Sequence, residues 1–109
     1  MSQLKKLILV TADHHPQHKL WTELAEKLAK ELGAELDVRY EDYVLLVEHG
    51  DTDDLGMAWL PQLLAELDDG KIVLLLSRLP LGKDLNPDLE EAYRAVIKRV
   101  NEITSVQGS

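Results

Sequence analysis

The first third of the chain combines two patterns that restrict it to a small set of folds. Residues 4–11 contain an apolar run after two lysines, which is typical of a strand buried on both faces. Over residues 16–32 apolar side chains recur every three to four positions, which predicts an amphipathic helix with the stripe Leu20, Trp21, Leu24, Ala25, Leu28, Ala29 and Leu32. A buried strand that leads directly into such a helix predicts an α/β domain.

The two ends of this helix carry residues that commonly bound one. Asp13 or His14 is expected to cap its start, and Pro16 suits its first turn. Gly33 is expected just beyond its last residue, where a left-handed backbone is common.

The middle of the chain is less distinct. From Glu35 apolar and charged residues alternate, which predicts a second strand. Residues 43–49 fit either an extension of that strand or a short helix that Asp42 caps and Gly50 ends. The acidic residues Asp51, Asp53 and Asp54 are interpreted as a solvated turn, because a Ca²⁺ loop of twelve residues with its bidentate glutamate is absent.

The second half of the chain predicts a hairpin and a last helix. Segments 60–67 and 71–78 are apolar and are joined by Asp68-Asp69-Gly70, which predicts a β-hairpin with a positive φ at Gly70. Asn86 is expected to cap the last helix, with Pro87 in its first position. Its apolar stripe is Leu89, Ala92, Tyr93, Val96, Ile97, Val100 and Ile103, and residues 104–109 are expected to fray.

Length and charge limit the classes of function. The 109 residues suit one domain, 1–109, with its core in about 4–103. A formal net charge of −8 disfavours binding to nucleic acid or to anionic membranes, and no apolar run approaches the roughly 20 residues that span a bilayer. No small-residue cleavage site follows the N-terminal apolar run, so a cytoplasmic location is expected.

The predicted order of elements resembles the thioredoxin fold, a central mixed four-stranded sheet (βαβ, then ββα) flanked by helices. His15-Pro16-Gln17-His18 lies where that family carries its C-x-x-C motif. Residues 55–61 resemble the family segment that ends in a cis-proline, here Pro61, and residues 69–71 resemble the turn between its last two strands. The resemblance covers about residues 4–103; a flavodoxin-like domain is the alternative if the hairpin is wrong.

The absence of cysteine separates this chain from the oxidoreductases of that family. Thiol–disulfide exchange needs a thiolate, which imidazole does not replace, so this activity is excluded. The resemblance still implies a surface where an extended peptide pairs with the backbone beside the cis-proline. The favoured hypothesis is therefore non-catalytic binding of a protein, a peptide or a second copy of the chain near 14–19 and 57–61, through His14, His15, Gln17, His18, Trp59, Leu60 and Pro61.

Two further interpretations concern the histidines and Trp59. His15 and His18, with His14 or His49 as a third ligand, form the alternative hypothesis of a Zn²⁺, Ni²⁺ or Cu²⁺ site. Without a metal they are solvated polar residues. Trp59 is either an exposed anchor for a partner or packs against Trp21 or Leu45 and Leu46.

Nothing in the sequence indicates catalysis. Ser77 and Thr11 have no nucleophile motif around them, and the chain has neither G-x-S-x-G nor a glycine-rich phosphate loop. An enzymatic role and a resident cofactor are therefore not expected.

Overall fold

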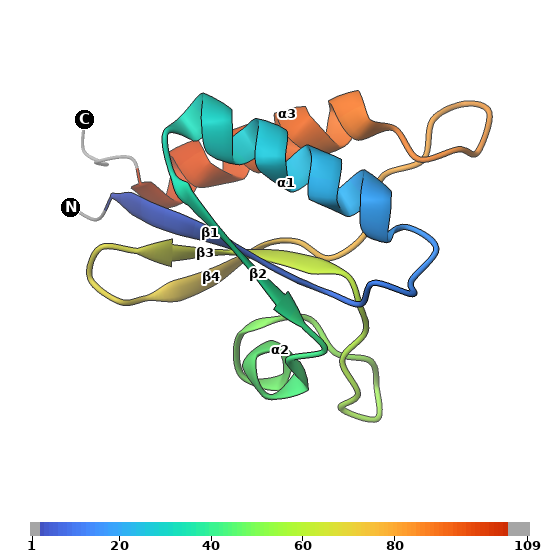
Figure 1. Ribbon diagram of the computed structural model, residues 1–109, viewed down its shortest axis with the longest axis horizontal. Helices are drawn as coiled ribbons and strands as arrows, with labels where there is room; N and C mark the ends of the chain where they lie inside the picture. The colour runs from blue at the N-terminus through green and yellow to red at the C-terminus, as the bar shows by residue number, and fades with distance from the viewer. Residues whose placement is uncertain (1–2, 105–109) are drawn as a thin grey trace.

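The computed structural model describes residues 3–104, which form an α/β domain with four strands and three helices (Figure 1). The elements follow one another in the order β1 (Leu4–Thr11), α1 (His18–Leu32), β2 (Glu35–Tyr40), α2 (Tyr43–His49), β3 (Gln62–Leu67), β4 (Ile72–Leu76) and α3 (Leu89–Thr104). The expected fraying of the C-terminal tail concerns residues that lie almost entirely outside the described range.

The strands form one mixed sheet in the order β2-β1-β3-β4. β1 is parallel to β2 and antiparallel to β3, and β3 is antiparallel to β4. Leu9 therefore lies between Val38 on one side and Leu63 on the other. The predicted mixed four-stranded sheet, with a parallel βαβ half and an antiparallel ββα half, is confirmed.

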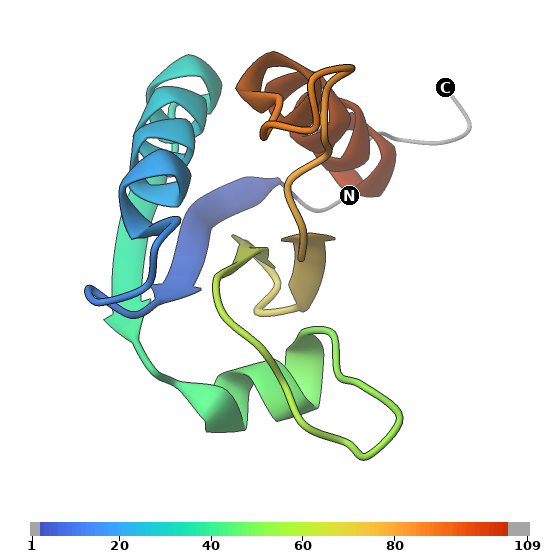
Figure 2. The same cartoon turned by 90° about the vertical axis from the view of Figure 1, so that its right-hand side faces the viewer.

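The helices cover the two faces of the sheet unequally. α1 and α3 lie together on one face, and α2 lies on the opposite face (Figure 2). Leu7 and Leu9 of β1 belong to the cluster beneath α1 and α3, whereas Ile8 and Val10 pack with Leu46 of α2. Because successive strand residues point to opposite faces, a strand covered on both sides needs an unbroken apolar run. This is the pattern seen in residues 7–10.

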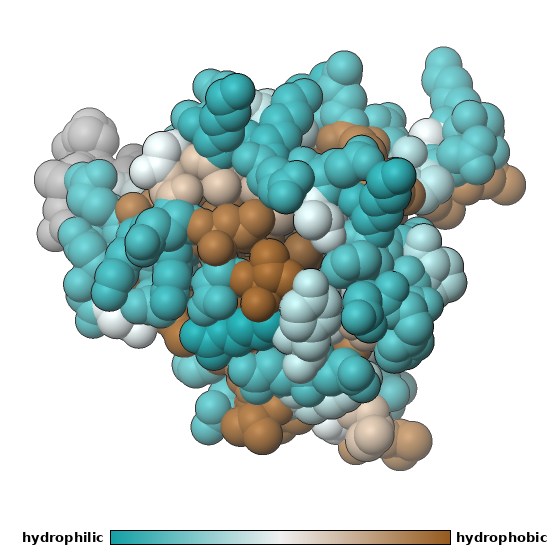
Figure 3. Space-filling model, in the orientation of Figure 1, coloured by the Kyte–Doolittle hydropathy of each residue, from teal (hydrophilic) through white to brown (hydrophobic). Residues whose placement is uncertain are grey.

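The structure resolves the ambiguity at residues 43–49 in favour of a helix. The Asp42 side chain accepts a hydrogen bond of 3.1 Å from the Leu45 amide, which is the geometry of an N-cap. Leu45 and Leu46 are buried, while Val44 and Val47 point outward and are more than half exposed. Figure 3 shows apolar residues at the lower edge of the molecule, where Figure 1 places α2.

The structure also confirms two glycine positions. Gly33 ends α1 with a φ of 65°, and its amide lies in the left-handed C-terminal turn. Gly70 has a φ of 89° in the turn between β3 and β4. The Leu60–Pro61 peptide bond is cis, as the family resemblance implied.

The predicted starts of two helices are wrong. α1 begins at His18 with Gln17 as its N-cap, so neither Asp13 nor His14 caps it. The reason is a competing turn, in which the His15 amide donates to the Ala12 carbonyl.

The last helix also begins later than its sequence pattern predicts. Asp88 caps α3 through its side chain, which accepts from the Glu91 amide at 3.0 Å. Asn86 instead bonds to Asp84, and Pro87 pairs with Leu81 in an isolated bridge. A local turn therefore uses the residues that would otherwise have capped the helix.

No helix within residues 3–104 is long and apolar enough to cross a membrane.

Candidate binding pocket

Three chain segments meet at one end of the sheet because of its strand directions. The end of β1, the beginning of β3 and the end of β4 lie at the same edge, since β3 runs antiparallel to both neighbours. The turn at residues 12–17, the segment 59–61 and the segment 77–81 therefore lie close together, at the end that faces the viewer in Figure 2. This edge is where the sequence resemblance placed the binding surface.

The turn before α1 holds His15 in a defined orientation. The Gln17 amide donates a hydrogen bond of 3.0 Å to His15 Nδ1, and the His18 amide donates to the His15 carbonyl at 3.1 Å. A ring nitrogen that accepts a hydrogen bond carries no proton. The neutral His15 ring therefore carries its proton on Nε2, which leaves Nε2 as a donor.

His18 lies differently, on the first turn of α1. Its Nδ1 shares a hydrogen bond of 3.0 Å with the hydroxyl of Thr11, a buried residue of β1. Its ring centroid lies 6.1 Å from that of Tyr40 at the end of β2. These contacts direct His18 toward β1 and β2, so it does not line the pocket that His15 lines.

A buried glutamine fixes the loop before Pro61. Gln62, the first residue of β3, is fully buried. Its side-chain amide donates to the carbonyls of Asp51 and Trp59, both at 2.9 Å, and its side-chain oxygen accepts from the Asp51 amide at 2.8 Å. Gly50 passes so close that an added Cβ would lie 2.7 Å from that oxygen. Gln62 thus ties the end of α2 to the segment before Pro61.

Trp59 contacts the segment that follows β4 through a hydrogen bond and a cation–π interaction. Its indole Nε1 donates to the Ser77 carbonyl at 2.9 Å, and the Arg78 guanidinium carbon lies 4.5 Å from the centre of a Trp59 ring. The Ser77 hydroxyl donates in turn to Asp51 at 3.0 Å. Trp59 is half-buried, so it is not the fully exposed anchor that one sequence interpretation expected. It is also absent from the two core clusters, one with Trp21 and one with Leu45 and Leu46, against which the other interpretation placed it.

These segments enclose a pocket of about 330 Å³. Its walls are His15, Gln17, Trp21, Trp59, Leu60, Pro61, Ser77, Arg78, Leu79 and Leu81. Of the surface residues predicted from sequence, five are brought together here: His15, Gln17, Trp59, Leu60 and Pro61. Pro61 is buried and lines the pocket, so it is not part of the exposed surface.

The backbone of Leu60 is unpaired at the edge of this pocket. Within the part of the chain that the structure describes, no hydrogen bond engages the Leu60 amide or carbonyl. Its side chain packs against the cluster of Ile8, Val10 and Leu46. Leu60 thus combines an anchored side chain with one free backbone donor and one free acceptor, next to the first residue of a strand.

The structure does not gather the residues of the predicted metal site. His14 is exposed in the turn before α1, and His49 is exposed at the end of α2. Among residues 3–104, no three histidine, aspartate or glutamate side chains lie together as ligands. A metal on His15 Nε2 would require the proton to move to Nδ1, where the Gln17 amide already donates.

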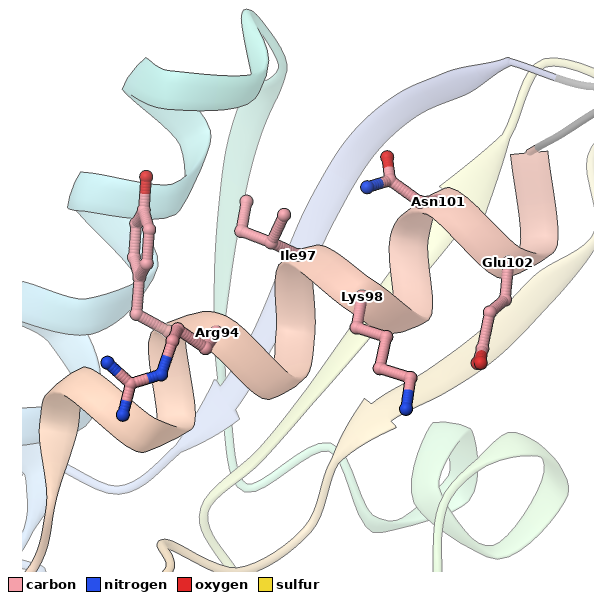
Figure 4. Close-up of a pocket in the computed structure, with 6 residues that line it drawn as sticks. Arg94, Ile97, Lys98, Asn101 and Glu102 are labelled. Carbon is pink, nitrogen blue, oxygen red and sulfur yellow. The ribbon is translucent and has the colours of Figure 1, made fainter.

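A second hollow, of about 700 Å³, lies elsewhere. All of its lining residues come from α3, among them Ile97, Lys98 and Asn101, and Figure 4 shows these side chains rising from that single helix. A hollow along one helix does not hold a ligand from several sides, whereas the smaller pocket does. The smaller pocket is therefore the better candidate site.

Sequence reasoning missed the contribution of residues 77–81 and of Gln62. Gln62 is a polar residue in a buried apolar strand, and this position alone is a signal, because buried polar groups require partners. Arg78 carries no such signal, since an arginine after a strand is usually a solvated residue.

Comparison with protein-family models, with curated protein sequences and with solved structures found no match for this chain.

Proposed function

We propose that the chain has a thioredoxin-like fold without redox chemistry, and that its pocket binds an extended peptide segment of a partner protein. In this proposal the segment pairs with the backbone of Leu60 and inserts a side chain between His15 and Trp59.

The fold part of the proposal is supported by the arrangement of the elements. The strand order β2-β1-β3-β4, with only β2 parallel to β1, agrees with the fold that the sequence resembles. The pocket also joins His15 to Pro61, two segments that are 46 positions apart (61 − 15) and that form one site in that family. Because the chain has no cysteine, this surface cannot carry out the thiol–disulfide exchange of the family's oxidoreductases.

The free backbone of Leu60 is the observation that carries the binding proposal. An extended peptide gains main-chain hydrogen bonds where it pairs with backbone groups that have no partner, and a neighbouring pocket selects its side chain. Leu60 offers both hydrogen-bonding groups, and the pocket lies beside it. Its volume is near the lower end of the roughly 300–1,000 Å³ typical of ligand sites, which suits one large side chain.

A histidine metal site is the weaker proposal. The described residues bring no third ligand to His15 and His18, and His15 is oriented as a donor rather than as a ligand.

A peptide-display selection tests the binding proposal. A random library is selected on the wild-type chain and on Leu81→Trp, in which an indole at the 60%-exposed rim fills the pocket. The selected peptides are expected to bind Leu81→Trp at least about tenfold more weakly, since a lost buried side chain contributes about 1.5–3 kcal/mol.

The matched control is Leu55→Trp, the same change at a residue that is 87% exposed and does not line the pocket. It is expected to bind like the wild type. Failure to enrich any peptide, or equal loss in both variants, would contradict the proposal. Sedimentation of the wild-type chain tests whether a second copy occupies the same surface, in which case Leu81→Trp shifts dimer to monomer.

A further inference from the structure

Arg78 differs from the other arginines of the described residues in having no partner carboxylate or carbonyl. Arg39 bonds to Asp37 and Asp42, Arg94 bonds to Glu90 and Glu91, and Arg99 donates to a backbone carbonyl. For Arg78 the structure of residues 3–104 records only its position over Trp59, at 4.5 Å. Its guanidinium donors are therefore free at the mouth of the pocket.

The pocket also lacks the acidic residues that are common elsewhere on the chain. The sequence contains 20 aspartates and glutamates against 12 lysines and arginines. None of the acidic residues lines the pocket, and Arg78 is the charged residue of its lining. The site is thus locally cationic on a protein of net charge −8.

The geometry of the two donor-bearing walls, Arg78 and His15, suits a carboxylate. Stacking on an aromatic face leaves the edge of a guanidinium open, and this planar fork matches the two oxygens of a carboxylate. The His15 ring, whose Nδ1 accepts from the Gln17 amide, presents its Nε2 hydrogen as a donor. A peptide carboxylate in the pocket would therefore meet donors from two walls, while the nearby Asp51 carboxylate, which lies outside the lining, accepts from the Ser77 hydroxyl.

We propose that the peptide bound in this pocket carries an aspartate or glutamate side chain, which pairs with Arg78. The inference rests on the proposed peptide-binding function and specifies its ligand class. The net charge of the chain opposes an acidic partner at long range, but at about 0.15 M salt charges more than roughly 8 Å apart are largely screened. The preference of the pocket for a peptide with an acidic side chain then depends on the short-range contact between that side chain and Arg78.

The test is the same display selection on three more variants, Arg78→Gln, Arg78→Glu and Arg94→Gln. Peptides from the wild type and from Arg94→Gln are expected to share an aspartate or glutamate at one position. Arg78→Gln is expected to remove that preference, and Arg78→Glu to replace it with lysine or arginine. Arg94 is the control, because it is an exposed arginine outside the pocket, on α3.

A second measurement uses the wild-type chain alone, so that it does not depend on how the variants fold. The best peptide is synthesised with blocked ends, once with its glutamate and once with glutamine at that position. The glutamine peptide is expected to bind at least about tenfold more weakly, as for a lost hydrogen bond to a charged group. Blocked ends ensure that a side chain, and not a terminal carboxylate, is responsible.

The two proposals fail differently. Peptides that bind in the pocket, lose affinity in Leu81→Trp and show no acidic preference would overturn the inference about Arg78 and leave the binding function standing. A selection that enriches only peptides with a free terminal carboxylate would also overturn it. A selection that enriches no peptide at all would overturn both.

Discussion

Replacement of Trp21 by alanine is expected to lower the free energy of unfolding by about 3–5 kcal/mol, as for other large aromatic side chains deleted from a core. Trp21 is 1% exposed and lies among Leu7, Leu9 and Leu28, between α1 and the sheet. Its removal would leave a cavity that connects with the pocket, because Trp21 also forms part of the pocket wall. The measurement is urea unfolding followed by far-ultraviolet circular dichroism, since the substitution removes a fluorescent indole.

The other tryptophan provides the matched control. Trp59→Ala removes the same atoms from a half-buried site and breaks one hydrogen bond, to the Ser77 carbonyl. It is expected to lower the unfolding free energy by at least about 1 kcal/mol less than Trp21→Ala, because less apolar surface is buried there. Equal losses at the two positions would contradict the assignment of Trp21 to the core.

Gln62→Leu is expected to lower the free energy of unfolding by about 2–4 kcal/mol, although the substitution keeps the side chain large and makes it apolar. Three backbone groups of Asp51 and Trp59 would lose their partner, and a buried polar group left unpaired costs about 1–3 kcal/mol. The same change should loosen the loop that positions Trp59. Chemical denaturation measures the first effect, and the Trp59 emission spectrum reports the second.

Gln17→Leu is the control for this prediction. Gln17 is half-buried, and its side-chain oxygen makes a single long hydrogen bond of 3.4 Å to Trp21. The loss expected there is about 1 kcal/mol, less than for Gln62→Leu, because one long hydrogen bond is lost rather than three short ones. If Gln62→Leu were as mild as Gln17→Leu, the network around Gln62 would not hold the loop.

The local patterns of the sequence predict most of the elements because those elements depend on neighbours in the chain. The apolar run in β1 indicates a strand whose two faces are both buried, and the apolar stripe in α1 indicates the one face of the helix that packs on the core. Residues 43–49 remain ambiguous in sequence because a short apolar segment fits both the helical repeat of about 3.6 residues and a buried strand. The Asp42 cap and the burial of Leu45 and Leu46 decide for a helix.

The starts of α1 and α3 could not be predicted from capping preferences alone. In both places a local turn contains the expected residues: the His15 amide donates to the Ala12 carbonyl across Asp13 and His14 before α1, and Asn86 bonds with Asp84 before α3. A single sequence does not rank such turns against helix caps of similar free energy.

The candidate site was predicted in part. The resemblance joined His15 to Pro61, but the wall formed by Ser77–Leu81 depends on long-range contacts across the sheet. The orientation of Arg78 over Trp59 likewise follows from the hydrogen bond of the Trp59 indole to the end of β4. Such contacts are set by tertiary packing and have no local signature.

Amide hydrogen exchange at Leu60 tests the central claim most directly, because that amide is free in the described structure and is proposed to donate to the peptide. Exchange is measured by nuclear magnetic resonance on the free chain and with a saturating, display-selected peptide. We expect fast exchange in the free chain and slowing of at least about tenfold in the complex. Unchanged exchange at Leu60 in a saturated complex would contradict it.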